Sequence, residues 1–191
     1  KEISLDEPAT AAGRIIVPAG ILSDVIRLLP DGEEEKMEIS WSKNHVAFTI
    51  GSTYFISNLI NGEYPEYQRV IPQSFDAHAE LNLHDFAEAV RFVSPISRDV
   101  NYNTINFHFK QGVLEVFEED PEIGRSDTSI SVKLEGDDID ITFNCSYIED
   151  ILKHSNGETI TLHLLKSGPM LVEQQDDKTY RYVVTPMRGR N

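Results

Sequence analysis

Hydrophobic and polar positions along the chain repeat one arrangement three times. Each copy starts with a short apolar strand pattern, continues with apolar residues at helical spacing, and ends in runs that alternate between apolar and polar residues. Helical spacing predicts a helix that buries one face, and alternation predicts half-buried strands. The first copy covers residues 14–60, and the others start at Ala77 and Asp138. The building block is therefore predicted to be a strand–helix–three-strand unit.

The three predicted helices align with one another at two apolar positions. These positions hold Leu22, Phe86 and Ile148, and then Ile26, Val90 and Leu152. A repeat of about 60 residues indicates an internal structural repeat. Two such units can form one domain in which antiparallel sheets carry two helices on one side, so the predicted fold class is α+β.

Local signals set the ends of several elements. Arg14–Val17 is expected to form a strand, because its isoleucines and valine favour extended backbone. The second helix is expected over Asp85–Val93. The third is expected to be capped by Ser146, since Glu149 three residues later completes a capping box.

The connection over residues 61–72 separates the first unit from the other two. It holds two prolines and two tyrosines, which indicates an ordered segment rather than a loose linker. We place a domain boundary just after it, near Ser74, which gives domains 1–74 and 75–191. The first unit then lacks a pair, and the chain does not begin with Met, so we expect that an upstream half is missing.

Composition narrows the class of protein. The net charge is −15, from 32 acidic and 17 basic residues, which argues against a protein that is basic throughout and binds nucleic acid. A polar N-terminus and short apolar runs predict neither a signal peptide nor a membrane span. The single cysteine, Cys145, fits a reducing compartment, so we expect a cytoplasmic protein.

Catalytic chemistry is not indicated by any motif. The six histidines are scattered, and none pairs with an acid at metal-ligand spacing, so we expect no enzyme activity, no metal and no cofactor. Arg27, Arg91 and Lys153 lie at or near the same helical position in the three units. They are either exposed cations or a basic face for a nucleic-acid backbone, and acids on the same helices weaken the second interpretation.

The last strand pattern, Tyr180–Arg188, ends where Pro186 removes a backbone donor. Taken alone, this segment is either a frayed end or one wall of a groove for a partner peptide.

Three stretches resemble the bacterial DNA polymerase III β subunit, the sliding clamp. They are Ile16-Val17-Pro18, the connection Asn-Gly-Glu-Tyr-Pro-Glu-Tyr-Gln-Arg-Val-Ile-Pro over residues 61–72, and the ending Tyr-Val-Val-Thr-Pro-Met-Arg over residues 182–188. Phe143-Asn144-Cys145-Ser146-Tyr147 also resembles the start of that family's last helix. The resemblance covers nearly the whole chain.

This resemblance implies a DNA-clamp fold and a non-catalytic processivity factor. In that family, two chains close head-to-tail into a ring whose helices face duplex DNA and contact its phosphates without reading sequence. The polymerase, the clamp loader and repair proteins dock short linear motifs in a groove. Carried over by motif, the groove residues here are Pro65, Arg69, Val70, Tyr102, Asn144, Tyr147, Gly168, Met170, Val183, Val184, Thr185, Pro186, Met187 and Arg188.

Departures from the family pattern lead to two further expectations. Thr185 is polar where relatives usually carry an aliphatic residue, and residues 189–191 run past the usual end. The Thr-Asp-x-His-Arg-Leu segment, which forms another groove wall, is missing. We expect that this polypeptide alone makes neither a normal ring nor a complete groove.

Two other function classes compete with the sliding clamp. The first is a protein-interaction module without a DNA role, and the second is an enzyme with an unrecognised site.

Overall fold

A computed structural model describes residues 13–29, 36–99, 103–177 and 179–187 of the chain. Contacts within it divide the chain into two compact units, and the division in the sequence falls between Glu66 and Tyr67. We call residues 13–66 the single-repeat unit and residues 67–187 the double-repeat unit, and each is described by itself. The division falls inside the connection that precedes the expected boundary near Ser74.

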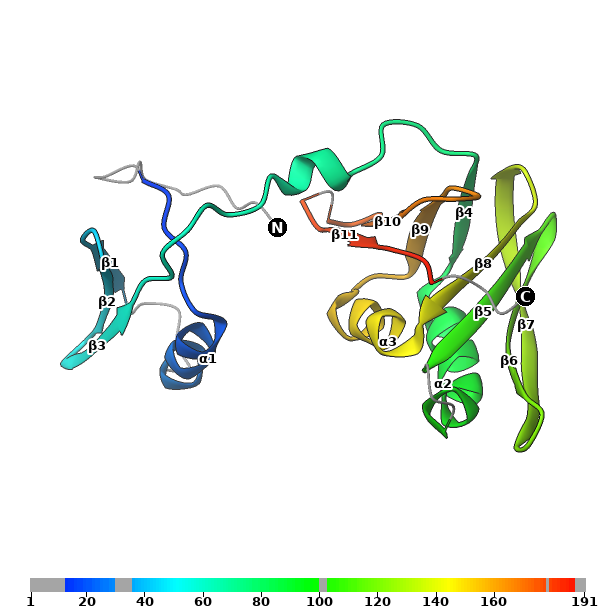
Figure 1. Cartoon of the computed structure of the whole chain (residues 1–191), viewed down its shortest axis with the longest axis horizontal. Helices are drawn as coiled ribbons and strands as arrows, with labels where there is room; N and C mark the ends of the chain where they lie inside the picture. The colour runs from blue at the N-terminus through cyan, green and yellow to red at the C-terminus, as the bar shows by residue number, and fades with distance from the viewer. Residues whose placement is uncertain (1–12, 30–35, 100–102, 178, 188–191) are drawn as a thin grey trace. The chain divides into compact units, whose positions relative to one another are not determined.

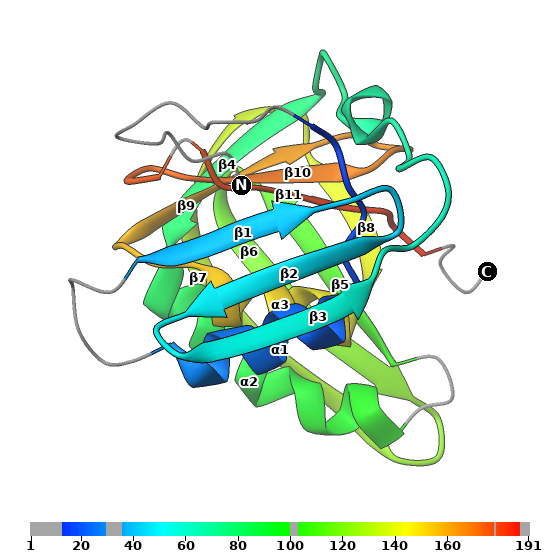
Figure 2. The ribbon, with the colours of Figure 1, turned by 90° about the vertical axis from the view of Figure 1, so that its left-hand side faces the viewer.

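The single-repeat unit is one helix against a three-stranded antiparallel sheet (Figures 1 and 2). Its elements are α1 (Ala19–Leu28), β1 (Met37–Trp41), β2 (His45–Ile50) and β3 (Thr53–Asn58), in the sheet order β1-β2-β3. The core is small: Val25 of α1 is buried together with Val46, Phe48 and Ile50 of β2.

Residues 14–17 form no strand, which corrects the expectation from their composition. The backbone of this segment contacts the end of the same repeat, where the Ile60 N–H donates to the Ile16 carbonyl at 2.9 Å. A strand needs a neighbour to satisfy its backbone groups. The corresponding strands of the double-repeat unit gain that neighbour from a second repeat, as described next.

The double-repeat unit contains two copies of the predicted building block. After a 3₁₀ turn, η1 (Tyr67–Val70), its elements are β4 (Ala77–Asn82), α2 (Leu83–Asp99), β5 (Thr104–Lys110), β6 (Gly112–Asp120), β7 (Gly124–Gly136), β8 (Ile139–Asn144), α3 (Cys145–His154), β9 (Thr159–Leu164), β10 (Met170–Gln174) and β11 (Arg181–Val184). The strands form an antiparallel sheet in the order β11-β10-β9-β4-β7-β6-β5-β8.

The first strand of each repeat pairs with a strand of the other repeat. Strand β4 pairs with β9 of the second repeat, and β8 of the second repeat pairs with β5 of the first. Helices α2 and α3 lie together against one face of this sheet (Figure 1). Side chains from both repeats meet in the core, where the Phe107 ring lies 5.9 Å from that of Phe86 and 6.0 Å from that of Phe143. The predicted α+β repeat with helices on one face of antiparallel sheets is confirmed.

Helix α2 is longer than the expected Asp85–Val93, because it continues through Pro95 to Asp99. Proline lacks the N–H that would bond to the carbonyl four residues earlier. The hydroxyl of Ser94 donates to that carbonyl, of Arg91, at 3.4 Å. The side chain thus partly replaces the missing backbone bond.

Candidate peptide-binding groove and helix surface

The C-terminal segment spans the gap between the two end strands of the sheet. Val183 and Val184 of β11 lie opposite Leu171 and Met170 of β10. Beyond β11, the Met187 N–H donates to the Thr142 carbonyl of β8 at 2.8 Å. The tail is therefore held as far as Met187, and it reaches β8 two residues before Asn144.

Asn144 joins β8 to α3 and caps the helix. Its Oδ1 accepts a hydrogen bond from the Ser146 N–H at 3.0 Å. The expected cap at Ser146 is therefore wrong, because α3 starts at Cys145 and Ser146 already lies in its first turn. The Asn103 amide supports this corner by donating to the Ser146 hydroxyl at 2.6 Å.

The expected groove residues around this corner differ in exposure. Met170 and Val184 are buried in the core, so they can support a groove only from below. Tyr147 and Thr185 are exposed. The remaining ones are half-buried, namely Asn144, Gly168, Val183, Pro186 and Met187. A surface of mixed apolar and polar groups results, built on the junction of β8, α3 and the tail.

Tyr182, the residue before Val183, is also half-buried next to this surface. Burial raises the pKa of its phenol, and the charges of Asp150 and Tyr147 add to the rise. Tyr182 therefore stays a neutral hydrogen-bonding group at physiological pH.

The other expected groove residues stay predictions. Pro65 belongs to the single-repeat unit. Arg69 and Val70 lie on η1, and Val70 is exposed. Tyr102 and Arg188 lie outside the described residues.

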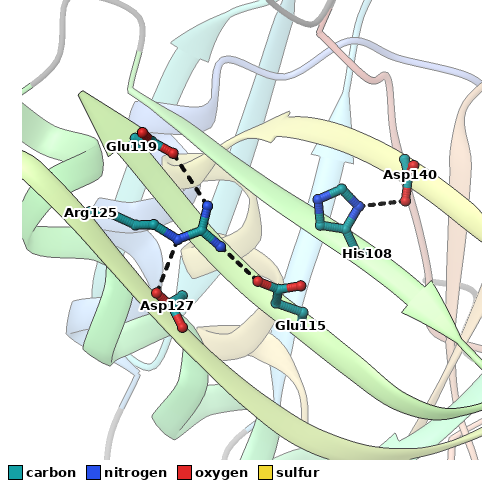
Figure 3. A network of polar contacts seen from close by, with 6 residues as sticks. All are labelled: His108, Glu115, Glu119, Arg125, Asp127 and Asp140. Carbon is teal, nitrogen blue, oxygen red and sulfur yellow. Dashed lines mark hydrogen bonds and ion pairs between the residues drawn. The ribbon is translucent and has the colours of Figure 1, made fainter. Parts of the chain in front are cut away.

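A hollow of about 670 Å³ lies beside the tail, and sequence reasoning did not foresee it. Its walls come from Pro186, Met187, Asn106, Phe107, His108, Phe117, Asp140, Ile141, Thr142, Lys166 and Ser167. His108 Nδ1 lies 2.5 Å from Asp140 Oδ1 (Figure 3). The His108 ring stacks on the Phe117 ring, and their centroids are 4.6 Å apart. Alternation along β5 and β8 indicates which side chains share a sheet face, but only the register between the strands brings them together.

Next to this hollow, one arginine is surrounded by carboxylates. Arg125 bonds to Asp127 at 3.0 Å, to Glu119 at 3.3 Å and to Glu115 at 2.7 Å (Figure 3). Its guanidinium also lies 4.6 Å from the centroid of the Phe117 ring. The bond to Asp127, followed by the other acids, raises the pKa of Arg125. Acids outnumber the base here, so this part of the sheet surface is negatively charged.

The three aligned helical bases each lie close to an acid three residues earlier. These pairs are Arg27 with Asp24 at 3.8 Å, Arg91 with Glu88 at 2.6 Å, and Lys153 with Asp150 at 3.3 Å. Arg91 and Lys153 also line one hollow of about 460 Å³ between α2 and α3, together with Glu149. The helix surface thus carries cations at repeated positions, but each is partly neutralised.

Among the described residues, no three His, Cys, Asp or Glu side chains converge as metal ligands would. Over the same residues, no helix is both long and apolar enough to cross a membrane.

Repeats that exchange their first strands and carry both helices on one face define the class of DNA sliding clamps. The chain belongs to the DNA polymerase III beta subunit family: the model of the C-terminal domain matches residues 68–188 and that of the central domain matches residues 1–66.

Individual relatives agree with the family match. The beta sliding clamp of Staphylococcus epidermidis is 27% identical over 176 residues, which cover 91% of this chain and 46% of that protein. The Bacillus subtilis sliding clamp structure has 26% identity and a TM-score of 0.91 over 98% of this chain and 50% of that one. A Pseudomonas aeruginosa clamp has 27% identity and a TM-score of 0.87, over 95% and 49%. The chain thus spans about half the length of the relatives that it matches.

Proposed function

We propose that the chain works as part of a processivity factor, a non-catalytic sliding clamp that tethers the replicative polymerase and other partners to duplex DNA. The family match supports this proposal, since the relatives are named beta sliding clamps. The main structural support is the position of the tail. The Met187–Thr142 contact holds it on β8, next to Asn144 and Tyr147. A bacterial replication protein of this kind would work in the cytoplasm.

The partner site is proposed to be a groove for short linear motifs of the polymerase, the clamp loader and repair proteins. Exposed Tyr147 and half-buried Val183, Pro186 and Met187 offer apolar surface for leucine or phenylalanine anchors. Asn144 offers an amide to peptide carbonyls, although its Oδ1 is already engaged as a helix cap. Extended peptides bound in this way gain affinity from a few anchors in pockets and from main-chain bonds.

DNA is proposed to pass the helix side of a ring formed by two complete chains, with Arg27, Arg91 and Lys153 toward its phosphates. The acids paired with these bases keep each contact weak. Weak contacts to phosphates that ignore sequence suit a protein that must slide.

Head-to-tail closure of the ring has support in strand β7. It pairs with β6 along Gly124–Val132, but with β4 only along Lys133–Gly136. Within the described residues, the other edge of its first part therefore carries no strand, and unpaired strand edges are ready templates for another chain. The residue directly before this strand, Ile123, is exposed and adds an apolar side chain next to the open edge.

Peptide binding tests the proposal. A fluorescent Gln-Leu-Ser-Leu-Phe peptide is titrated with the chain and with Tyr147→Ala, which removes an exposed ring at the groove. We expect binding at least about tenfold weaker, the size of effect that truncation of an aromatic anchor causes. Phe92→Ala is the matched control, since Phe92 is an exposed ring on α2. Equal loss in both variants, or no loss in Tyr147→Ala, would refute the groove.

A further inference from the structure

Two histidines from different repeats meet on the sheet of the double-repeat unit. His78 of β4 lies directly opposite His163 of β9, and their Nδ1 atoms are 2.6 Å apart. The neighbouring Ala79 and Leu162 belong to the core, so both histidine rings point to the sheet face away from the helices. The two residues are 85 positions apart, so spacing in the sequence did not indicate this contact. The pairing of β4 with β9 creates it.

One of the two rings is held in a fixed orientation. His163 Nε2 lies 3.2 Å from Glu173 Oε2, and Arg181 Nε lies 3.2 Å from the other oxygen of that carboxylate. A neutral imidazole has one N–H and one lone pair, and the bond that one nitrogen makes decides the role of the other. The Nε2–H of His163 donates to Glu173, so its Nδ1 presents a lone pair to His78.

The surroundings shield the pair on one side and leave it open to solvent on another. The Phe75 ring lies 5.8 Å from the His78 ring and 5.1 Å from the His163 ring, so it forms an apolar wall beside both. His163 is half-buried, whereas His78 is exposed. The contact therefore combines one fixed nitrogen, one adjustable nitrogen and access for water.

We propose that His78 and His163 bind one divalent transition-metal ion, such as zinc or nickel, through their Nδ1 atoms, with water as the remaining ligands. Imidazole nitrogen is a preferred ligand of these ions. A metal-bound histidine usually donates its other N–H to a carboxylate, as His163 does to Glu173. His78 then carries its own proton on Nε2, so two neutral imidazoles bind the ion without a net loss of protons.

The separation of the two nitrogens is close to what such an ion requires. Bonds of about 2.0–2.1 Å place two imidazole nitrogens on neighbouring corners of one ion roughly 2.9–3.4 Å apart. The Nδ1 atoms therefore have to separate by less than about 1 Å, which rotation of the exposed His78 ring provides. The bound ion would link β4 of one repeat to β9 of the other, and this role does not depend on the proposed peptide groove.

Calorimetric titration of the whole chain with zinc chloride tests the proposal, at about pH 7.5, where imidazole is mostly neutral. We expect one saturable site that His78→Gln weakens at least about tenfold, because one of its two protein ligands is lost. His163→Gln should have a similar effect. His108→Gln is the matched control, since His108 of β5 also lies beside a carboxylate, that of Asp140, and should leave the affinity unchanged.

Urea unfolding provides a second readout, because an ion that binds only the folded state stabilises it. Zinc should raise the unfolding midpoint of the double-repeat unit in the unaltered chain and in His108→Gln, but not in His78→Gln. Magnesium, which prefers oxygen ligands, should have no such effect. A chain without saturable zinc binding overturns the proposal. So does zinc binding that His78→Gln leaves unchanged, or magnesium binding of equal strength, since the net charge of −15 would then explain it.

Discussion

The two units show what the repeat can and cannot do by itself. In the double-repeat unit, 26 buried apolar residues form one continuous core between the two repeats. In the single-repeat unit, the described residues bury four in such a cluster. All three repeats have a helix followed by three antiparallel strands, but only in the double-repeat unit is that helix preceded by a strand, which pairs with the other repeat, so the difference comes from pairing. Stability in this fold arises between repeats, because each one presents a helix face and a strand edge that only another surface can satisfy.

The largest predicted effect compares one repeat position in both units. Phe86→Ala should lower the free energy of unfolding of the double-repeat unit by about 3–5 kcal/mol, because it leaves a cavity in a close-packed core. Leu22→Ala, at the exposed counterpart, should cost less than about 1 kcal/mol. Urea unfolding separates the units, since the single tryptophan, Trp41, reports on the single-repeat unit and far-UV circular dichroism reports mostly on the larger one.

This comparison must be made at concentrations where the chain is monomeric. If Leu22→Ala were then as costly as Phe86→Ala, the two positions would be equally buried and the contrast between the units would be lost.

The elements and their order were predictable from the sequence, because periodicity directly reflects which faces are buried. The errors concern features that this periodicity does not encode, namely the pairing of a strand, the passage of a helix through a proline and the identity of a helix cap. Residues 14–17 have strand-forming side chains, but the described residues hold no second repeat that pairs with them. Helix α2 passes Pro95 with help from the Ser94 hydroxyl. The cap of α3 is Asn144 rather than Ser146, because β8 continues one residue beyond Phe143 and the helix follows it directly.

The candidate site was predictable only in part, because sequence motifs mark single segments but not the pairing of strands. Two sequence motifs, the chain's ending and the segment Phe143–Tyr147, identified the tail and the start of α3. The Met187–Thr142 contact brings these two segments to one corner. The hollow lined by His108 and Asp140 was not foreseen, because these side chains meet only through the register of β5 and β8. No local signal in the sequence encodes that register.

A smaller effect sharpens the comparison at the helix starts. Asn144→Ala should lower the stability of the double-repeat unit by about 1 kcal/mol, because α3 loses the side chain that caps its first turn. Helix α1 begins after Pro18, which makes no side-chain cap bond, so Pro18→Ala should remove no such contribution. Urea midpoints measured by circular dichroism test this, with Asn144→Asp as a control that keeps a cap. Equal losses for Asn144→Ala and Asn144→Asp would show that the cap bond is unimportant.

The smallest predicted effect is a pH dependence of stability. It arises at a contact between the two repeats of the double-repeat unit. His78 of β4 and His163 of β9 come from different repeats, and their Nδ1 atoms lie 2.6 Å apart. Glu173 faces His163 Nε2 at 3.2 Å, Arg181 bonds to Glu173, and the Phe75 ring lies 5.1 Å from that of His163. Burial lowers the pKa of His163, and the bond to Glu173 opposes this only in part.

Since the pKa of His163 is lower in the folded state, the unfolded chain binds more protons below its ordinary value of 6.5. The stability of the double-repeat unit should therefore fall as pH drops from about 7.5 to about 5.5, by less than about 1 kcal/mol after solvent screening. Urea midpoints at both pH values measure this loss, which His163→Gln should reduce. His84→Gln, at an exposed site of α2, should leave it unchanged. A pH effect that persists in His163→Gln would mean that this contact between the repeats is not its source.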